Sequence, residues 1–294
     1  MNSRSVIPLE RVDGDKAQSV FDMVVGAAGC STVADNEKLS CLRDLDYETY
    51  FNATNSVPGF LSYSSLSLSD QPRPDSKTLT ASPDIFANEV KYAAVPGTFF
   101  SLFQANITTE SDLSTYLNDI IYRDATREEI TALIDAYPYN NGSSGSPYGT
   151  GTLNEQYPQF KRLAAILGDL ESILSRRFFL ATLPSSVPAW SFLATWDHGT
   201  PILRSFHTPD LPPIFYGTDA PRLAIQDRCI SFITLMDPNN GIEHAPAGSK
   251  AYWPKWHDKT ELMEFEWNDT SLIVDDFRWA SYEYIKAHIN SFRY

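Results

Sequence analysis

The strongest constraint on the fold is one long apolar helix pattern near the middle of the chain. Between Pro158 and Leu183, large apolar side chains recur at helical spacing, at positions Phe160, Leu163, Leu167, Leu170, Leu174 and Phe178. A stripe of this length is stable in water only when its apolar side packs against other elements. The pattern therefore predicts a core helix, and nothing in it indicates a cofactor.

Shorter patterns predict further elements on both sides of this helix. We expect helices over residues 15–30, within 39–55, over 108–121 and over 275–289. Gly29 would end the first of them, and a capping box formed by Thr126 and Glu129 would begin a further helix. Strands are predicted around 189–196 and at Met263–Trp267. Residues 56–82 and 137–151 are rich in Ser, Pro and Gly, which is typical of loops. The chain is thus expected to be rich in helices, with few strands.

Composition and charge exclude several classes of function. The chain has 294 residues, 43% of them hydrophobic, which is ordinary for a globular protein. Its net charge of −14 disfavours binding to nucleic acid or to an anionic membrane, because phosphate recognition needs clustered Lys and Arg. No segment approaches the length of a transmembrane helix.

Two features of the chain point to different cellular compartments. The first residues do not resemble a signal peptide, since a long apolar stretch is missing and acidic residues come early. Cys30 and Cys41 bracket a short polar loop and could close a disulfide ring, whereas Cys229 lies in an apolar helical stretch, as expected of a buried thiol. Candidate N-glycosylation sites occur at Asn52, Asn106, Asn141 and Asn268. The interior therefore suggests a secreted protein, while the start suggests the cytoplasm.

The familiar catalytic motifs are missing from the sequence. It contains no Gly-x-Ser-x-Gly, no glycine-rich phosphate loop and no CxxC, and the five histidines lack metal-ligand spacing. We therefore expect no metal and no cofactor. His207 is the one histidine in a suggestive place, on a loop after a predicted strand, where α/β enzymes keep a general base. On position alone, a surface histidine is the better interpretation; His198 is interpreted as a turn residue.

Several separate blocks of sequence resemble the type-B carboxylesterase/lipase family, most of all its fungal secreted branch, with the cholinesterases more distant. They are AAGCSTVADNEKLSCLRDLDYETYFNATNSVPG, GSPYGTGTLNEQYPQFKRLAAILGD, SRRFFL, FHTPDL and DDFRWASYEY, and they follow one another in the family's order. The resemblance implies an α/β-hydrolase fold in which residues 1–294 are the C-terminal part of a single domain, with a remnant of the central sheet.

The family resemblance also assigns roles to individual residues. The family uses a Ser-Glu-His triad, and His207 matches its histidine. The usual Gly-x-Phe-His-Gly around that histidine is Arg204–Thr208 here, with both glycines replaced. Cys30 and Cys41 match a family disulfide.

The same resemblance implies that most of the catalytic machinery is missing. The family's nucleophile and oxyanion hole precede the block that this chain begins with. Its acid follows a buried strand that would stand between Pro96 and Gly97, where KYAAVP is instead joined directly to Gly97-Thr98. We therefore expect a secreted member of a carboxylic ester hydrolase family, acting on small-molecule or lipid esters when complete, but inactive as written. The alternatives are a non-catalytic binding or interaction module, or a truncated gene-model fragment with no independent function.

Overall fold

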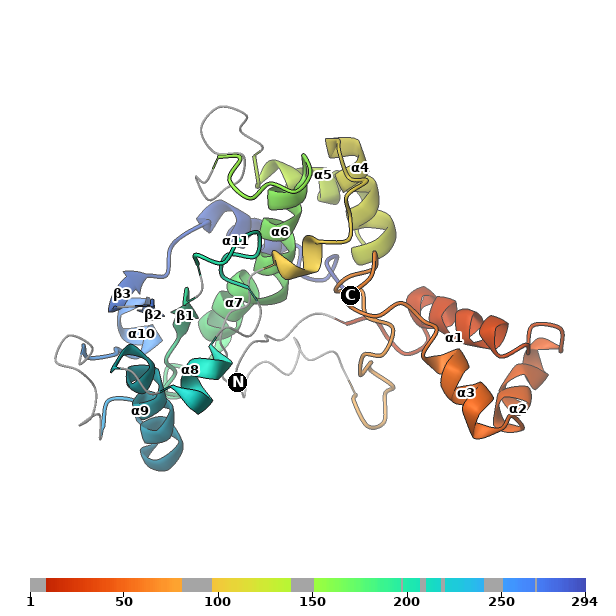
Figure 1. Ribbon diagram of the computed structural model, residues 1–294, viewed down its shortest axis with the longest axis horizontal. Helices are drawn as coiled ribbons and strands as arrows, with labels where there is room; N and C mark the ends of the chain where they lie inside the picture. The colour runs from red at the N-terminus through yellow and green to blue at the C-terminus, as the bar shows by residue number, and fades with distance from the viewer. Residues whose placement is uncertain are drawn as a thin grey trace.

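The structure is a computed structural model that describes residues 9–80, 97–138, 151–196, 198–206, 210–217, 220–240, 251–267 and 269–294. Helices dominate it, and a small sheet lies toward one end (Figure 1). Among the described residues, no helix is both long enough and apolar enough to cross a membrane.

The predicted core helix is confirmed and forms the centre of the molecule (Figure 1). It runs without a break through α6 (Phe160–Gly168), the π-helical turn η5 (Asp169–Ile173) and α7 (Leu174–Thr182). Its apolar stripe belongs to the largest hydrophobic cluster. The π turn was not predicted: there, the Leu174 N–H donates to the carbonyl of Asp169, five residues back.

Four further segments pack into the same cluster as the core helix. They are α4 (Glu110–Tyr116), its π-helical continuation η4 (Leu117–Ile121), α5 (Arg127–Asp135) and α11 (Trp279–Ala287). The predicted capping box is present: Glu129 N–H donates to Thr126 Oγ1 at 3.2 Å, and Thr126 N–H donates to Glu129 Oε2 at 2.8 Å. A short 3-10 turn, η3 (Phe99–Ser101), lies against α6.

The N-terminal helices form an arm with a small core of its own. It contains α1 (Asp15–Ala27), η1 (Asp35–Glu37), α2 (Lys38–Arg43) and α3 (Tyr47–Thr54), and it projects away from the sheet (Figure 1). The single helix predicted within 39–55 is therefore two helices, because Asp46 accepts from Thr49 N–H and starts α3. A disulfide joins Cys30 to Cys41, whose Cα atoms are 6.0 Å apart, as the spacing suggested.

The sheet has three strands in the order β1-β2-β3, namely β1 (Phe192–Ala194), β2 (Glu261–Phe265) and β3 (Thr270–Val274). β1 pairs parallel to β2, with Leu193 opposite Glu264, and β2 pairs antiparallel to β3. The first two strands were predicted and the third was not. Within the part of the chain that the structure describes, β1 is paired along one edge only.

Three helices complete the region around the sheet: α8 (Leu211–Tyr216), α9 (Ala220–Leu235) and α10 (Trp256–Lys259). Trp196, Ile225, Trp253, Met263 and Phe265 form the cluster between them and the strands. Cys229 on α9 is half-buried, and burial together with the charge of Asp210 raises the pKa of its thiol to about 11.

A buried carboxylate ties the core helix to the sheet. Asp275, directly after β3, is fully buried and accepts hydrogen bonds from both guanidinium Nη atoms of Arg176 at 2.7 and 2.8 Å. Arg177 Nη2 donates to the same carboxylate at 2.9 Å and Trp256 Nε1 at 2.8 Å. Burial alone would raise the pKa of Asp275, but the charges and hydrogen bonds of Arg176 and then Arg177 outweigh it and lower the pKa to about 2.

Candidate functional site

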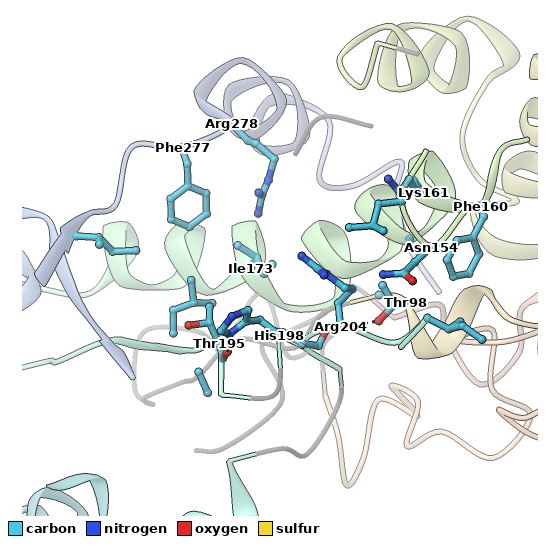
Figure 2. A pocket seen from close by; sticks show the side chains of 18 residues that line it. Thr98, Asn154, Phe160, Lys161, Ile173, Thr195, His198, Arg204, Phe277 and Arg278 are labelled. Carbon is cyan, nitrogen blue, oxygen red and sulfur yellow. Dashed lines mark hydrogen bonds between the residues drawn. The ribbon is translucent and has the colours of Figure 1, made fainter. Parts of the chain in front are cut away.

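A cavity of about 360 Å³ lies beside β1, between α6 and the segment 198–206 (Figure 2). Its volume falls in the range of small-molecule sites. Most of its wall is apolar and comes from segments far apart in the sequence, including Phe160, Ile173, Leu193, Ile202 and Phe277.

Gly97 and Thr98 bring the segment after the Pro96-Gly97 join to this cavity. Gly97 lies directly on α6, where a Cβ atom would be 2.1 Å from the carbonyl oxygen of Ala164, so this close approach requires glycine. Thr98 Oγ1 donates to the carbonyl of Leu203 at 2.8 Å, which fixes segment 198–206 against the same place. Residues 81–96, on the other side of the join, lie outside the described part of the chain.

Segment 198–206 turns sharply through two left-handed residues. Ile202 has φ +68° and Arg204 has φ +57°, a backbone conformation that costs about 1–2 kcal/mol per residue for side chains other than glycine. The Arg204 N–H donates to the carbonyl of Thr200 at 2.9 Å and closes the turn. The Arg204 side chain lines the cavity as a result (Figure 2).

Lys161 and Arg204 lie at the same end of the cavity, opposite Phe277, with Ile173 between the two ends (Figure 2). Lys161 is nearly buried and donates to the carbonyl of Gly151. Burial lowers the pKa of its amine, the charge of Glu155 raises it, and the charge of Arg204 lowers it further. The Lys161 amine therefore lies within reach of both the Glu155 carboxylate and the Arg204 guanidinium.

Arg278 also lines the cavity, but its charge is already balanced. Its guanidinium contacts both carboxylate oxygens of Asp169 at 2.6 Å. No Asp or Glu is found among the described residues that line the cavity. Arg204, at the other end, lines the cavity without a carboxylate beside it in the lining.

The histidine singled out from the sequence, His207, lies outside the described residues, so its role as a base stays a prediction. Arg204 and Ser205, which precede it, line the cavity. His198 lies in a turn as predicted, with its Nδ1 3.2 Å from the carbonyl oxygen of Thr195, and it also lines the cavity.

Two of the four candidate glycosylation sites lie within the described residues. Asn52 on α3 and Asn106 are exposed, while Asn141 and Asn268 lie outside the described residues. In the described ranges, no group of three His, Cys, Asp or Glu side chains could hold a metal ion. Sequence analysis did not identify Lys161 as a site residue, because the helix pattern around it is defined by apolar positions. Arg204 was noted only because it replaces a glycine of the family motif.

Comparison with known proteins gives close relatives among fungal lipases. The chain is 48% identical to the secreted triacylglycerol lipase LIP1 of Gibberella zeae, over 98% of the chain and 50% of that protein. It is 44% identical to secreted lipase 1 of Botryotinia fuckeliana, over 99% of the chain and 52% of that protein. Lipase 5 of Diutina rugosa is 37% identical, over 99% of the chain and 54% of that protein. No protein-family profile matches. The chain thus spans about half the length of the curated relatives it matches.

A solved structure shows the fold. The crystal structure of Aspergillus niger EstA superposes on this chain with a TM-score of 0.75 at 18% identity, over 100% of the chain and 58% of EstA. The chain therefore has an α/β-hydrolase fold, rich in helices and with a small three-stranded sheet in the described residues.

Proposed function

The chain belongs to the family of fungal secreted lipases and carboxylesterases, and from this premise we propose that it is an incomplete ester hydrolase. It supplies the general base His207 and part of the substrate region, but it hydrolyses no ester as written. Substrates of the complete form would be small-molecule or lipid esters, as the names of the lipase relatives suggest.

The observation that carries this proposal is the lack of a Gly-x-Ser-x-Gly motif anywhere in the 294 residues. In a serine hydrolase, the base acts only by taking a proton from a nucleophile, and an acid must orient the base. At the Pro96-Gly97 join, where the family places its acid, the sequence has Val-Pro-Gly-Thr and no carboxylate. Removing a triad lowers kcat by on the order of 10⁶, and loss of an oxyanion hole lowers the rate further.

The organisation of the whole protein follows from the same premise. We propose that residues 1–294 are the C-terminal part of a single hydrolase domain, from the order of the sequence blocks that resemble the family. The match to about half of each relative supports only that the chain is a part of such a protein. The relatives are named as secreted, which supports an extracellular location for this protein too. The disulfide and the exposed sequons at Asn52 and Asn106 fit such a location.

Ester hydrolysis by the purified chain tests the proposal directly. With p-nitrophenyl butyrate, we expect no release of nitrophenol above buffer, and His207→Ala should behave like the unchanged chain. A fluorophosphonate probe, which labels activated serines, should leave the chain unlabelled while labelling a full-length secreted lipase assayed beside it. Turnover that His207→Ala abolishes, or a labelled serine, would overturn the proposal.

A second function is favoured by the cavity itself. A non-catalytic binding module needs only a shaped, accessible site, and the chain has a cavity with a mostly apolar wall. Binding without turnover would show as saturable affinity for a ligand that contains no ester bond.

A further inference from the structure

We propose that the junction between the N-terminal arm and the rest of the molecule is a pH-sensitive hinge, with Lys16 as its switch. When the Lys16 amine is neutral, the arm stays closed at this junction, and when the amine is protonated, the junction opens. The inference concerns the arm alone, so it stands or falls independently of the cavity beside β1 and of ester hydrolysis.

The arm and the rest of the molecule have separate hydrophobic clusters, and Lys16 lies between them along the chain. Leu9 belongs to the largest cluster, whereas Val25 belongs to the small cluster of the arm. Lys16 is in the first turn of α1, the helix that begins the arm. The arm projects from the molecule at this point (Figure 1). A change in the surroundings of Lys16 therefore acts where the arm is attached.

The Lys16 side chain is buried without a hydrogen-bond partner. The residue is 4% exposed, and its Nζ atom is shielded from solvent and makes no hydrogen bond to the described part of the chain. Burying an ammonium group costs far more free energy than burying a neutral amine, because water solvates a charge strongly. The closed junction therefore accommodates the neutral amine better than the charged one.

Charged groups from three other segments act on the Lys16 amine. Glu10 comes from the segment before α1, Arg73 from the loop after α3, and Arg123 from just after η4. The Arg73 side chain is 5% exposed, and its Nη1 atom lies 3.9 Å from Glu10 Oε2, so this carboxylate is shared between two cations. Two guanidinium groups thus oppose a charge on Lys16, while one shared carboxylate favours it.

The main chain is held firmly before Lys16 and weakly after it. The Glu10 N–H and Arg73 Nη1 both donate to the main-chain oxygen of Tyr294, at 3.2 and 3.3 Å. The Val12 N–H donates to the carbonyl of Pro74 at 3.0 Å. Within α1, by contrast, Ser19 accepts from Arg123 Nη1 at 3.5 Å, which is long for a hydrogen bond. This difference places the hinge at the start of α1.

The direction of the response follows from the pKa of Lys16. Burial and the charges of Arg73 and Arg123 lower this pKa to about 7 against the opposing charge of Glu10, whereas an exposed lysine has a pKa of about 10.4. Because the open form exposes the amine, it binds the proton more tightly, so opening becomes more favourable as the pH falls from about 10 to about 7. Below about pH 7 both forms carry the proton and the dependence ends. From pH 9 to pH 6, the opening constant should rise on the order of 100-fold.

Hydrogen exchange followed by mass spectrometry tests the hinge in the whole chain. After correction for the intrinsic pH dependence of exchange, it gives an opening constant for each peptide. Peptides from α1 and α3 should show the rise between pH 9 and pH 6, with a plateau below pH 7. Peptides from the core helix, α6 and α7, should not show it, because their packing does not involve Lys16.

Three variants assign the response to Lys16. Lys16→Met keeps the length of the side chain without its charge, so the opening constant should stay at its low pH 9 value throughout. Lys77→Met removes the same charge from an exposed position in the neighbouring loop and should keep the full response. Lys16→Arg stays protonated over this range and should be open at both pH values, which tests the hinge even where Lys16→Met fails to fold.

Two results would overturn the inference. One is a Lys16→Met or Lys16→Arg variant whose arm peptides respond to pH as those of the unchanged chain do. The other is an equal rise in the peptides of α6 and α7, which would mean that the whole protein loosens on acidification. Neither result depends on catalysis, whereas failure of the proposed function would appear in the nitrophenyl ester assay.

Discussion

Replacing Asp275 by Asn should destabilise the protein far more than its small chemical change suggests. The carboxylate is fully buried and neutralises two guanidinium groups, those of Arg176 and Arg177. An amide would keep the shape but leave two buried positive charges without a counter-ion. Breaking a buried ion pair by removing one partner costs about 3–5 kcal/mol, a large fraction of the roughly 5–15 kcal/mol by which proteins are stable.

The pKa of Asp275 gives an independent measure and a pH window. The pKa of the Asp275 carboxyl is lowered to about 2 in the folded protein, whereas an aspartate in an unfolded chain has a pKa of about 3.9. Because the folded pKa is the lower one, the contribution to stability is fully present above about pH 5 and is lost as the pH falls through about 2. At about 1.4 kcal/mol per pKa unit, it amounts to roughly 2.6 kcal/mol at neutral pH.

Urea unfolding followed by tryptophan fluorescence measures this difference, since Trp256 itself donates to Asp275. With a slope near 3 kcal/mol per molar urea, the Asp275→Asn midpoint at pH 7 should fall by about 1–1.7 M. Asp276→Asn, the same change at the exposed neighbouring position, should shift the free energy of unfolding by no more than about 0.5 kcal/mol. The gap between Asp275→Asn and the unchanged protein should narrow on acidification from about pH 5 toward pH 2. Equal midpoints for the two variants, or a gap that does not depend on pH, would refute the reasoning.

Two further changes test the packing. Reducing the Cys30–Cys41 disulfide should lower the stability of the arm by about 2–3 kcal/mol in the loop-entropy account. In thermal melts, the Cys30→Ser variant should have the same melting temperature as the reduced protein, and added reductant should not change it. A melting temperature of Cys30→Ser that still falls on adding reductant would contradict this. Gly97→Ala should lower the free energy of unfolding by about 1–3 kcal/mol or more, because its Cβ would meet the Ala164 carbonyl oxygen at 2.1 Å. Gly199→Ala, whose Cβ would meet nothing within 4 Å, should leave the urea midpoint nearly unchanged. Similar midpoints for the two variants would argue against the close contact at Gly97.

The elements that local sequence specifies were the ones that could be predicted. The apolar stripe of the core helix and the Thr126 capping box each depend on residues within a few positions of one another, and both are present. β3 escaped prediction because it is a short edge strand: its first two residues are polar, and of its five side chains only that of Thr270 is buried. The split of the second helix depends on Asp46, a cap that a search for apolar spacing passes over.

The cavity could not have been predicted in the same way. It is assembled from Gly97, the core helix, β1 and segment 198–206, which meet only through tertiary packing. The direction of Arg204 depends on a left-handed backbone that Arg rarely adopts, so no propensity indicates it. Sequence analysis did point to two segments at this cavity: the residues just before His207 and the Pro96-Gly97 join.

The π turn in the core helix sets the angular phase between its two halves. A regular α-helix advances about 100° per residue, whereas a π turn holds one residue more in about the same rotation. The five residues Asp169–Ile173 therefore turn the chain about as far as four α-helical residues would. If the same five residues adopted regular α-helical winding, everything after them would rotate by roughly 90–100° relative to α6. Arg176 and Arg177 would then face away from Asp275, although neither they nor their partner had changed. The π turn thus acts as a rotational offset that aligns a helix with the sheet beside it.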